Sequence, residues 1–330
     1  MSCDGPATVE IAEGALARLG QILEEYTCPL CVSDEQIHSV YSRDLEEIIG
    51  KPCKWMMAAH YSHNAIQSFD GFDVVIGFGG GASLDVAKLI ARNTGLGWIS
   101  VPTAASHDGI ASEVASVSQD GYKYSEKCKG PLAVIADISI ISKAPPRLKL
   151  AGLGDIICKT SSLAEWKLAH EVKDEPFDDH VYSLVDRALD SVLADDSFET
   201  LIQAEIDAGR AMSIFGSSRP CSGTEHAISH AMDRTCTELH GLQVAFATPL
   251  CLHYLHEVGY TKYTPSMIHE YMTHREMPTT FQEIGVTKAS FFDDVHHALR
   301  IMNKRERYSV LDHFNVDDAN LSNVLQSLGY

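Results

Sequence analysis

The first half of the chain alternates short, continuously hydrophobic segments with longer segments whose hydrophobic residues recur every three or four positions. The short segments predict strands, because a strand inside a parallel sheet is buried on both faces. The longer segments predict amphipathic helices. The expected strands are 7–11, 29–33, 55–59, 73–77, 98–101 and 132–136, and the expected helices are 15–26, 43–49 and 83–93.

The pattern changes after Pro145 and Pro146. From Gly154 onward the hydrophobic residues follow helical spacing, for example over 156–170 and 181–193. Strands that alternate with helices indicate a parallel sheet covered by helices on both faces. The sequence therefore predicts a Rossmann-like α/β domain over residues 1–146 and an all-α domain over residues 147–330.

Composition and charge narrow the class of protein. The chain has 330 residues, of which 45 are acidic and 26 are basic, and the net charge of −19 disfavours nucleic-acid binding. No hydrophobic run reaches the ~18 residues of a membrane span, and the N-terminus lacks the pattern of a signal peptide. The nine scattered cysteines are typical of reduced thiols. We therefore expect a cytoplasmic homo-oligomer that acts on a small molecule.

A glycine-rich segment, Gly77 to Gly81, follows the fourth predicted strand and leads into a helix. Glycines let backbone N–H groups approach a ligand closely, and a helix N-terminus favours an anion. The pyrophosphate of a dinucleotide suits this arrangement, whereas the alternative is a tight turn without a ligand. The match to the Rossmann pattern is weak, because no acidic residue stands ~20 positions downstream.

Three histidines in the second half have the spacing of a metal site. His226 and His230 are four residues apart and would share one face of a helix, and His240 would lie on a neighbouring helix. With Asp155 at a predicted helix start, two imidazoles and one carboxylate would hold a divalent metal and leave a position for substrate. The alternative is that each histidine is an ordinary polar side chain, as we expect for most of the 16.

Five motifs stand in a characteristic order between about residue 70 and residue 250. They are Gly79-Gly80-Gly81-x-x-x-Asp85-x-x-Lys88, Pro102-Thr103-x-x-Ser106-His107-Asp108-Gly109, Gly154-Asp155, Ser222-Gly223-x-Glu225-His226-x-x-x-His230 and His240-Gly241-x-Gln243-Val244-Ala245. Together they resemble the sn-glycerol-1-phosphate dehydrogenase family, in the superfamily of glycerol dehydrogenase, iron-containing alcohol dehydrogenases and dehydroquinate synthase. The stretch between His60 and Phe72 is short for this family, and no role is transferred beyond about residue 260.

The resemblance implies a dehydroquinate synthase-like architecture and a metal-dependent NAD(P)H oxidoreductase. It implies that the domain over residues 1–146 binds the nicotinamide dinucleotide and that the domain over residues 147–330 binds metal and substrate. The implied reaction interconverts dihydroxyacetone phosphate and sn-glycerol 1-phosphate by hydride transfer at C2. The implied ligands of Zn²⁺, with Fe²⁺ and Ni²⁺ as alternatives, are Asp155, His226 and His240, and the implied catalytic residues are Asp155, His230 and Asp108. The implied NAD(H) or NADP(H) positions are Gly79, Gly80, Gly81, Ala82, Ser83, Asp85, Thr103, Ser106, Ser112 and Asp34.

Three alternatives stay open. The first is a glycerol or other alcohol dehydrogenase of the same superfamily, although the Ser-His-Asp-Gly and Ser-Gly-x-Glu-His motifs favour the branch that uses a phosphate. The second is a cyclase similar to dehydroquinate synthase, in which a Glu is the first metal ligand in place of Asp155. The third is a binding protein that has lost turnover. The sequence does not discriminate between NADH and NADPH.

Overall fold

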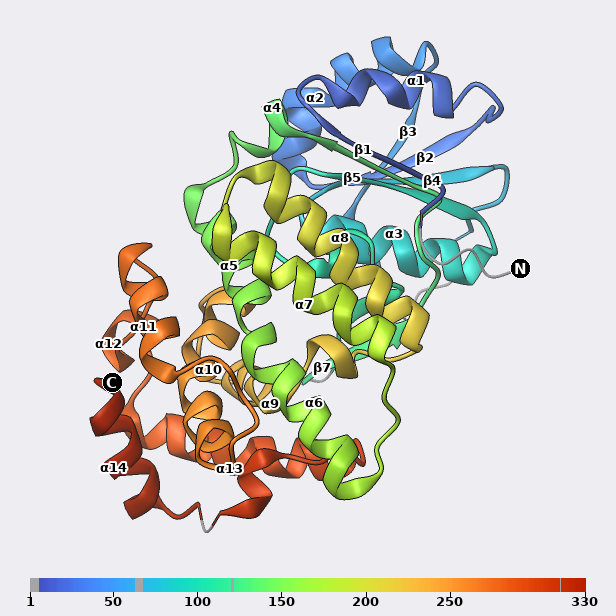
Figure 1. The fold of residues 1–330 in the computed structure, drawn as a ribbon. Coiled ribbons are helices and arrows are strands. Elements are labelled where there is room, and N and C mark those ends of the chain that lie inside the picture. Colours follow the sequence, from blue (N-terminus) through green and yellow to red (C-terminus); the bar gives the residue numbers. More distant parts are fainter. Residues whose placement is uncertain (1–5, 63–67, 120–121, 315) are drawn as a thin grey trace. The chain divides into compact units, whose positions relative to one another are not determined.

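The structure is a computed structural model that describes residues 6–62, 68–119, 122–314 and 316–330. The chain divides into two compact units (Figure 1). The first comprises Met1–Gln119, Tyr124–Lys149 and Asp196–Ile214, and the second comprises Asp120–Lys123, Leu150–Asp195 and Phe215–Tyr330. The domain boundary at residue 146 stays a prediction, and the first unit also takes in residues 196–214. Within the stretch that is short for the family, residues 63–67 lie outside the described residues.

The first unit is built on a parallel sheet that has six strands within the described residues. In spatial order they are β1 (Thr8–Ala12), β8 (Ala133–Asp137), β5 (Gly97–Pro102), β4 (Val74–Gly79), β2 (Pro29–Ser33) and β3 (Lys54–Met57). Every residue of β2, β4 and β8 is buried, as expected for strands covered on both faces. The fold class predicted from the hydrophobic pattern is therefore confirmed.

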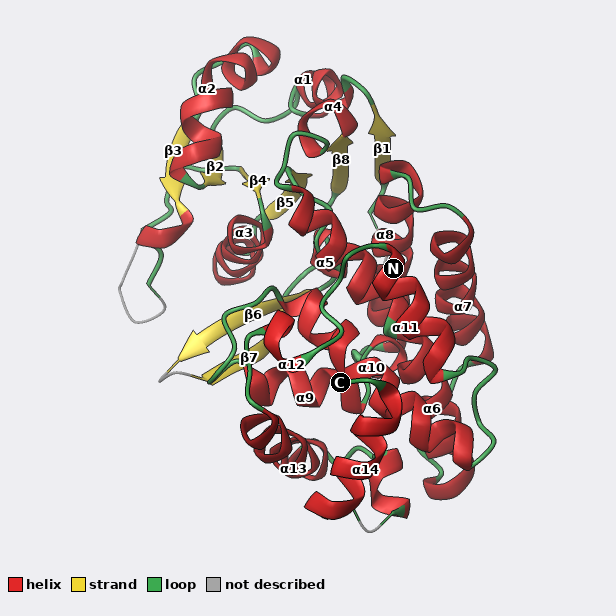
Figure 2. Cartoon of the chain, turned by 90° about the vertical axis from the view of Figure 1, so that its left-hand side faces the viewer, coloured by secondary structure: helices red, strands yellow, loops and turns green. Residues whose placement is uncertain are grey.

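Helices cover both faces of this sheet. They are α1 (Arg18–Ile22), α2 (Glu35–Ile49), α3 (Gly81–Thr94) and α4 (Ile138–Ile141). Figure 2 shows α1, α2 and α4 on one face and α3 on the other. The strand order reverses between β2 and β4, because the chain passes from β2 outward to β3 and then returns to β4. Ligands of open parallel sheets bind at such a switch point, beyond the carboxyl ends of the strands.

The elements of the first unit differ from the prediction in three places. The helix expected over 43–49 begins at Glu35, because the Asp34 side chain accepts a hydrogen bond from the Ile37 N–H and caps it. The helix expected over 15–26 ends at Ile22. A two-stranded sheet of β6 (Val114–Gln119) and β7 (Tyr122–Lys127) is not predicted by the pattern, since its second strand, YKYSEK, is largely polar.

Helices make up the second unit, as predicted. The expected helix over 156–170 is divided at Cys158, and no helix in the described part of the chain is long and apolar enough to cross a membrane. The helices that begin or lie in this unit are α5 (Pro146–Ile157), α6 (Lys159–Lys173), α7 (Asp179–Ala194), α9 (Thr224–Met232), α10 (His240–Glu257), α11 (Pro265–His274), α12 (Phe281–Ile284), α13 (Lys288–Lys304) and α14 (Asp318–Leu328). Helix α10 is almost completely buried and packs against α9, which in turn packs against α13.

Helices α5 and α10 meet backbone to backbone at two glycines. A Cβ atom on Gly241 would overlap the carbonyl oxygen of Ala151, and a Cβ atom on Gly154 would overlap the carbonyl oxygen of Gly241. Only glycine permits this approach, because the obstructing atoms belong to the backbone and cannot swing aside. Asp155 and His240 are the sequence neighbours of these glycines, so the close approach also draws their side chains together.

Candidate functional site

A carboxylate and two imidazoles from three helices converge in the second unit. The Asp155 Oδ1 atom of α5 lies 3.6 Å from the His226 Nε2 atom of α9. The His226 ring centroid lies 5.3 Å from that of His240, the first residue of α10. The ligand atoms of Asp155, Cys158 and His226 all lie within 4.8 Å of one another, and His240 stands beside this tighter group without belonging to it. The donor set of one carboxylate, two imidazoles and a nearby thiol fits a divalent transition metal.

The charge of Asp155 is balanced by a buried lysine. Lys159 lies one helical turn further on, with its Nζ atom 3.5 Å from Asp155 Oδ2, and both side chains are almost completely buried. Burial alone would raise the pKa of Asp155, but the Lys159 ammonium, followed by His226 and His240, holds it well below its usual value. Asp155 is therefore a carboxylate that is ready to bind a cation.

Glu225 fixes the orientation of the His226 ring. The His226 Nδ1–H donates to Glu225 Oε1 over 2.8 Å, and the buried Glu225 also accepts from the Gly223 N–H and the Ser161 hydroxyl. Burial acts to lower the pKa of His226, but Cys158, Asp155 and Glu225 hold it well above its usual value. Because Nδ1 is occupied by Glu225, Nε2 is the nitrogen that faces Asp155.

A chain of three hydrogen bonds fixes the orientation of His240. The Gln243 amide nitrogen donates to the Glu238 carbonyl oxygen over 3.0 Å, which leaves its amide oxygen to accept from Ser229 over 2.7 Å. With its own proton committed to Gln243, the Ser229 hydroxyl oxygen accepts from His240 Nδ1 over 2.9 Å. The proton of His240 therefore resides on Nδ1, and Nε2 keeps the lone pair that a metal requires.

His230, a predicted catalytic residue, lies beside this group. Its ring centroid is 5.8 Å from that of His240, and its Nδ1 atom is 3.9 Å from Asp233 Oδ2. Burial lowers the pKa of His230; the carboxylate of Asp233 opposes this shift, and the positive charge of Arg305 adds to it. His230 is thus a neutral imidazole near neutral pH.

The predicted cofactor positions gather at the carboxyl edge of the first unit's sheet. Gly79 ends β4, and Gly80 and Gly81 begin α3, which has no side-chain cap at its N-terminus. The Thr103 N–H donates to the Gly79 carbonyl oxygen over 3.0 Å. A Cβ atom on Gly79 would lie 3.4 Å from Asp34 Oδ2, so the capping carboxylate of α2 lies at the same edge. The glycine loop and the Asp34 carboxylate therefore lie at the same edge of the sheet, at the point where the strand order reverses.

Two predicted cofactor residues have structural partners. Asp85 forms an ion pair of 3.0 Å with the buried Lys88 and accepts from the Ser116 N–H. The Ser112 hydroxyl lies 3.5 Å from Lys88 Nζ and 3.3 Å from the Val114 carbonyl oxygen. These contacts join α3 to the β6 strand. Among the remaining predicted positions, Ala82 and Ser83 lie in the first turn of α3, Ser106 precedes the 3-10 turn Asp108–Ile110, and Asp108 opens that turn.

Several residues of the site are not found by the sequence reasoning. Cys158, Lys159 and Ser229 belong to no recognised chemical pattern, and Glu225 and Gln243 stand in motifs without an assigned role. His107 is a further case in the first unit, because its ring occupies the space that a Cβ atom on Gly81 would need. For the residues on helices, the only sequence signal is a polar or thiol side chain within a predicted helix, and its importance becomes visible once burial is known.

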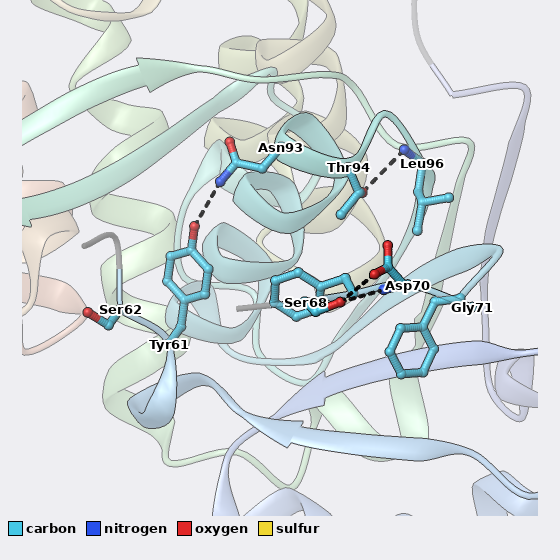
Figure 3. Close-up of a pocket in the computed structure, with 10 residues that line it drawn as sticks. Tyr61, Ser62, Ser68, Asp70, Gly71, Asn93, Thr94 and Leu96 are labelled. Atoms are coloured by element: carbon cyan, nitrogen blue, oxygen red, sulfur yellow. Dashed lines mark hydrogen bonds between the residues drawn. The ribbon is translucent and has the colours of Figure 1, made fainter. Parts of the chain in front are cut away.

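A cavity of about 510 Å³ in the first unit lies apart from these positions. Figure 3 shows Tyr61 and Asn93 joined across it, with the Asn93 amide donating to the Tyr61 hydroxyl over 3.1 Å. Thr94 and Leu96, at the C-terminal end of α3, also line it, whereas the glycine loop lies at the opposite end of that helix. No predicted site residue is among its described lining residues.

Comparison with known proteins first identifies the class of protein to which the fold belongs. A family model described as iron-containing alcohol dehydrogenase matches residues 10–145. Among solved structures, a probable glycerol dehydrogenase from Sinorhizobium meliloti superposes with a TM-score of 0.78 at 19% identity, covering 98% of this chain and 96% of that one. Glycerol dehydrogenase from Schizosaccharomyces pombe superposes with a TM-score of 0.76 at 17% identity, covering 98% and 89%. The fold is that of the iron-containing alcohol dehydrogenases and glycerol dehydrogenases.

Sequence identity to curated relatives then identifies the family of this chain. A glycerol-1-phosphate dehydrogenase [NAD(P)+] from Pyrococcus horikoshii is 35% identical over 321 residues, which cover 93% of this chain and 84% of the relative. One from Methanothrix thermoacetophila is 39% identical over 250 residues, which cover 72% and 68%. The chain belongs to the glycerol-1-phosphate dehydrogenase family of NAD(P)-dependent oxidoreductases. Membership supports a nicotinamide dinucleotide and a metal as its cofactors.

Proposed function

We propose that this protein reduces dihydroxyacetone phosphate to sn-glycerol 1-phosphate with NADH or NADPH, by hydride transfer to C2. The observation that carries the proposal is the proximity of Asp155, His226 and His240, with the Nδ1 atom of each imidazole held by a neighbouring side chain, Glu225 or Ser229. The names of the curated relatives support the choice of substrate.

Asp155, His226 and His240 would hold the metal, with Zn²⁺ as the first candidate and Fe²⁺ or Ni²⁺ as alternatives that suit the same donors. When bound, such an ion supplies Lewis-acid chemistry, polarising the C2 oxygen of the substrate. Cys158 lies close enough to the ligand atoms to favour metals that accept sulfur.

The chain's own residues supply charge balance, orientation and proton transfer. Lys159 offsets the carboxylate of Asp155 in a buried environment, and Glu225 and Ser229 hold the two imidazoles. His230 is neutral and half-buried, so it can donate a hydrogen bond to a substrate hydroxyl and pass a proton outward. The substrate-orienting role of Asp108, in the first unit, remains part of the proposal.

The first unit would bind the dinucleotide. We place the pyrophosphate at the N-terminus of α3, where backbone N–H groups after Gly80 lack a side-chain cap. The adenine ribose would lie near Asp34 at the switch point between β2 and β4. The other predicted contacts are Thr103 and Ser106. We also propose that the protein acts as a homo-oligomer.

The test is NAD(P)H consumption with dihydroxyacetone phosphate, with and without a chelator. We expect turnover that the chelator abolishes and added Zn²⁺ restores. The product is then offered to an sn-glycerol-3-phosphate-specific dehydrogenase, which should leave it unoxidised. Faster turnover of dihydroxyacetone than of its phosphate would favour a glycerol dehydrogenase. Failure to oxidise NAD(P)H with either substrate, in protein that contains metal, would overturn the proposal.

A further inference from the structure

An almost completely buried carboxylate on α6, that of Glu165, binds the first turn of α9. Its Oε2 atom accepts from the Thr224 N–H over 2.9 Å, and its Oε1 atom accepts from the Thr224 hydroxyl over 2.6 Å. Thr224 is the first residue of α9, and the N-cap residue, Gly223, has no side chain that could cap the helix. Glu165 therefore caps α9 from a neighbouring helix, because it binds a free N–H group and places a negative charge at the positive end of the helix dipole.

The first turn of α9 also carries His226, a proposed metal ligand. The Glu225 Oε1 atom accepts from the Gly223 N–H over 2.7 Å and from the His226 Nδ1–H over 2.8 Å, so one oxygen joins the helix start to the imidazole ring. A Cβ atom on Gly223 would lie 2.6 Å from Glu165 Oε2 and 2.9 Å from Glu225 Oε2. The two carboxylates therefore meet at Gly223, and a shift of the helix start would move the oxygen that holds His226.

Glu165 also binds a segment from the C-terminal part of the chain, Tyr308–Val310. Its Oε1 atom accepts from the Val310 N–H over 2.9 Å, and the Ser309 hydroxyl lies 2.7 Å from the Thr224 hydroxyl. One carboxylate thus joins α6, the start of α9 and a segment that lies 145 residues further along the chain than Glu165. The family resemblance transfers no role to residues beyond about 260, so only the structure connects this segment to α9.

Arg219 supplies the counter-charge in this buried network. Its Nη1 atom lies 3.1 Å from Glu165 Oε2, its Nε atom lies 2.8 Å from Glu175 Oε2, and its Nη2–H donates to the Tyr308 carbonyl oxygen over 3.0 Å. Burial raises the pKa of Glu165, Arg219 lowers it and Glu225 raises it. Three of the four groups that contact the Glu165 carboxylate are N–H groups, which can only donate, so they favour its ionised form. A fully hydrogen-bonded buried network of this kind holds its members rigidly.

We infer that Glu165 is a positioning residue of the metal site: it fixes the first turn of α9 and thereby, through Glu225, the ring of His226. The segment Tyr308–Val310 completes the same network and shares this role. Fixing a ligand before the metal binds raises metal affinity, because less conformational freedom is lost on binding. The inference rests on the proposed function, because it concerns the metal site of that reaction.

The first test compares Thr224→Val with Thr248→Val. Each substitution removes a buried hydroxyl and keeps the shape of the side chain. The Thr224 hydroxyl donates to Glu165, whereas the Thr248 hydroxyl donates to the Val244 carbonyl oxygen of its own helix over 2.7 Å. Both variants should have a lower urea midpoint than wild type, because each loses buried hydrogen bonding. Only Thr224→Val should weaken Zn²⁺ binding, by about tenfold in chelator competition. Equal Zn²⁺ affinities for the two variants would overturn the inference.

The second test changes Glu165 itself. Glu165→Gln keeps the volume but loses the charge and one acceptor oxygen. We expect its Zn²⁺ dissociation constant to rise by about 10- to 100-fold and the visible spectrum of its Co²⁺-loaded form to change, because the His226 ring is no longer fixed. Ser309→Ala removes the hydroxyl that contacts Thr224 and should give a smaller loss of Zn²⁺ affinity, about threefold. If Glu165→Gln does not yield folded protein, Thr224→Val and Ser309→Ala decide the question.

The outcomes separate the inference from the proposed function. If wild type binds Zn²⁺ but does not reduce dihydroxyacetone phosphate, the proposed function fails, and a loss of Zn²⁺ affinity in the Glu165 and Thr224 variants would still support the positioning role. If wild type binds no divalent metal, both are wrong. If Glu165→Gln and Thr224→Val keep the Zn²⁺ affinity and the Co²⁺ spectrum of wild type, the network serves stability alone and the inference is refuted.

Discussion

The Nδ1 atom of His240 lies 2.9 Å from the hydroxyl oxygen of Ser229, and this contact determines which ring nitrogen carries the proton. Ser229 is one turn before the end of α9 and His240 opens α10, so one hydrogen bond joins the two helices of the metal site. The hydroxyl is itself oriented by Gln243. The ligand geometry therefore depends on residues that do not touch the metal.

Removing this hydroxyl should weaken metal binding. In Ser229→Ala, His240 loses its acceptor and its ring can rotate or change tautomer, so we expect metal affinity to fall by about 10- to 100-fold. Chelator competition measures the dissociation constant directly. Ser191→Ala, which removes an exposed helical hydroxyl on α7, should leave it unchanged. Equal affinities for both variants would mean that the contact is not needed to orient His240.

Glu225→Gln should affect His226 in the same way. Glutamine keeps the volume and one acceptor oxygen, but it loses the negative charge that holds the Nδ1 proton of His226. We expect about a tenfold loss of metal affinity, and a fall in the free energy of unfolding, because the buried carboxylate also accepts from the Gly223 N–H and the Ser161 hydroxyl. A Co²⁺-substituted protein would report the altered ligand field in its visible spectrum. An unchanged spectrum and affinity would contradict a positioning role for Glu225.

Gly241→Ala tests the helix contact that brings Asp155 and His240 together. The added methyl group would overlap the Ala151 carbonyl oxygen, so α5 and α10 must move apart. We expect a loss of about 3 kcal/mol in the free energy of unfolding and a fall in metal affinity. Gly130→Ala is the control, because its Cβ atom would meet Glu113 only at ordinary contact distance, 3.6 Å. Its stability should change by less than about 0.5 kcal/mol, and urea unfolding measures both variants.

Asp155→Asn separates metal binding from charge balance. The substitution should abolish turnover and metal retention, and it also removes the anion that balances the buried Lys159. A buried charge that loses its counter-ion costs about 3–5 kcal/mol of stability. The double variant Asp155→Asn/Lys159→Met should therefore regain stability in urea unfolding without regaining metal. If Asp155→Asn kept metal and near-normal turnover, the assignment of this ligand would be wrong.

The raised pKa of Asp294, a residue outside the metal site, predicts that the stability of the protein depends on pH. Burial raises the pKa of this α13 carboxyl from 3.8 to about 6, with the Thr235 hydroxyl and Arg234 acting against the shift. The contribution of the Asp294 carboxyl to the free energy of unfolding is most favourable below about pH 4, where this group is protonated in both the folded and the unfolded state. The contribution is lost as the pH rises through 6. Asp294→Asn should therefore be more stable than wild type by about 1–2 kcal/mol at pH 7.5, allowing for partial solvation. At pH 4.5 the difference should fall to about a third of its value at pH 7.5; a constant difference at both pH values would exclude this cause.

Local patterns predicted much of the fold. The strands at 29–33 and 73–77 were correctly predicted because a strand buried on both faces must be hydrophobic throughout, whatever packs against it. The placement of His226 and His230 on one helix and His240 on the next follows from spacing alone. The two-stranded sheet of β6 and β7 was missed, because a largely polar strand carries no such pattern. Helix α2 was predicted too short, because its first turns are polar and depend on the Asp34 cap.

The sequence by itself determined the class of fold and the glycine loop, because these depend on residue types within a few positions of one another. It proposed the three candidate metal ligands through motifs that resemble a known family. Only the tertiary structure decided which side chains surround them. Ser229 is brought to His240 by the packing of α9 against α10, and burial is what makes Lys159 the charge partner of Asp155. The residue types in such contacts are common ones, so the sequence does not mark them. Their importance comes from burial, because charges and hydrogen bonds interact more strongly in the protein interior than in water.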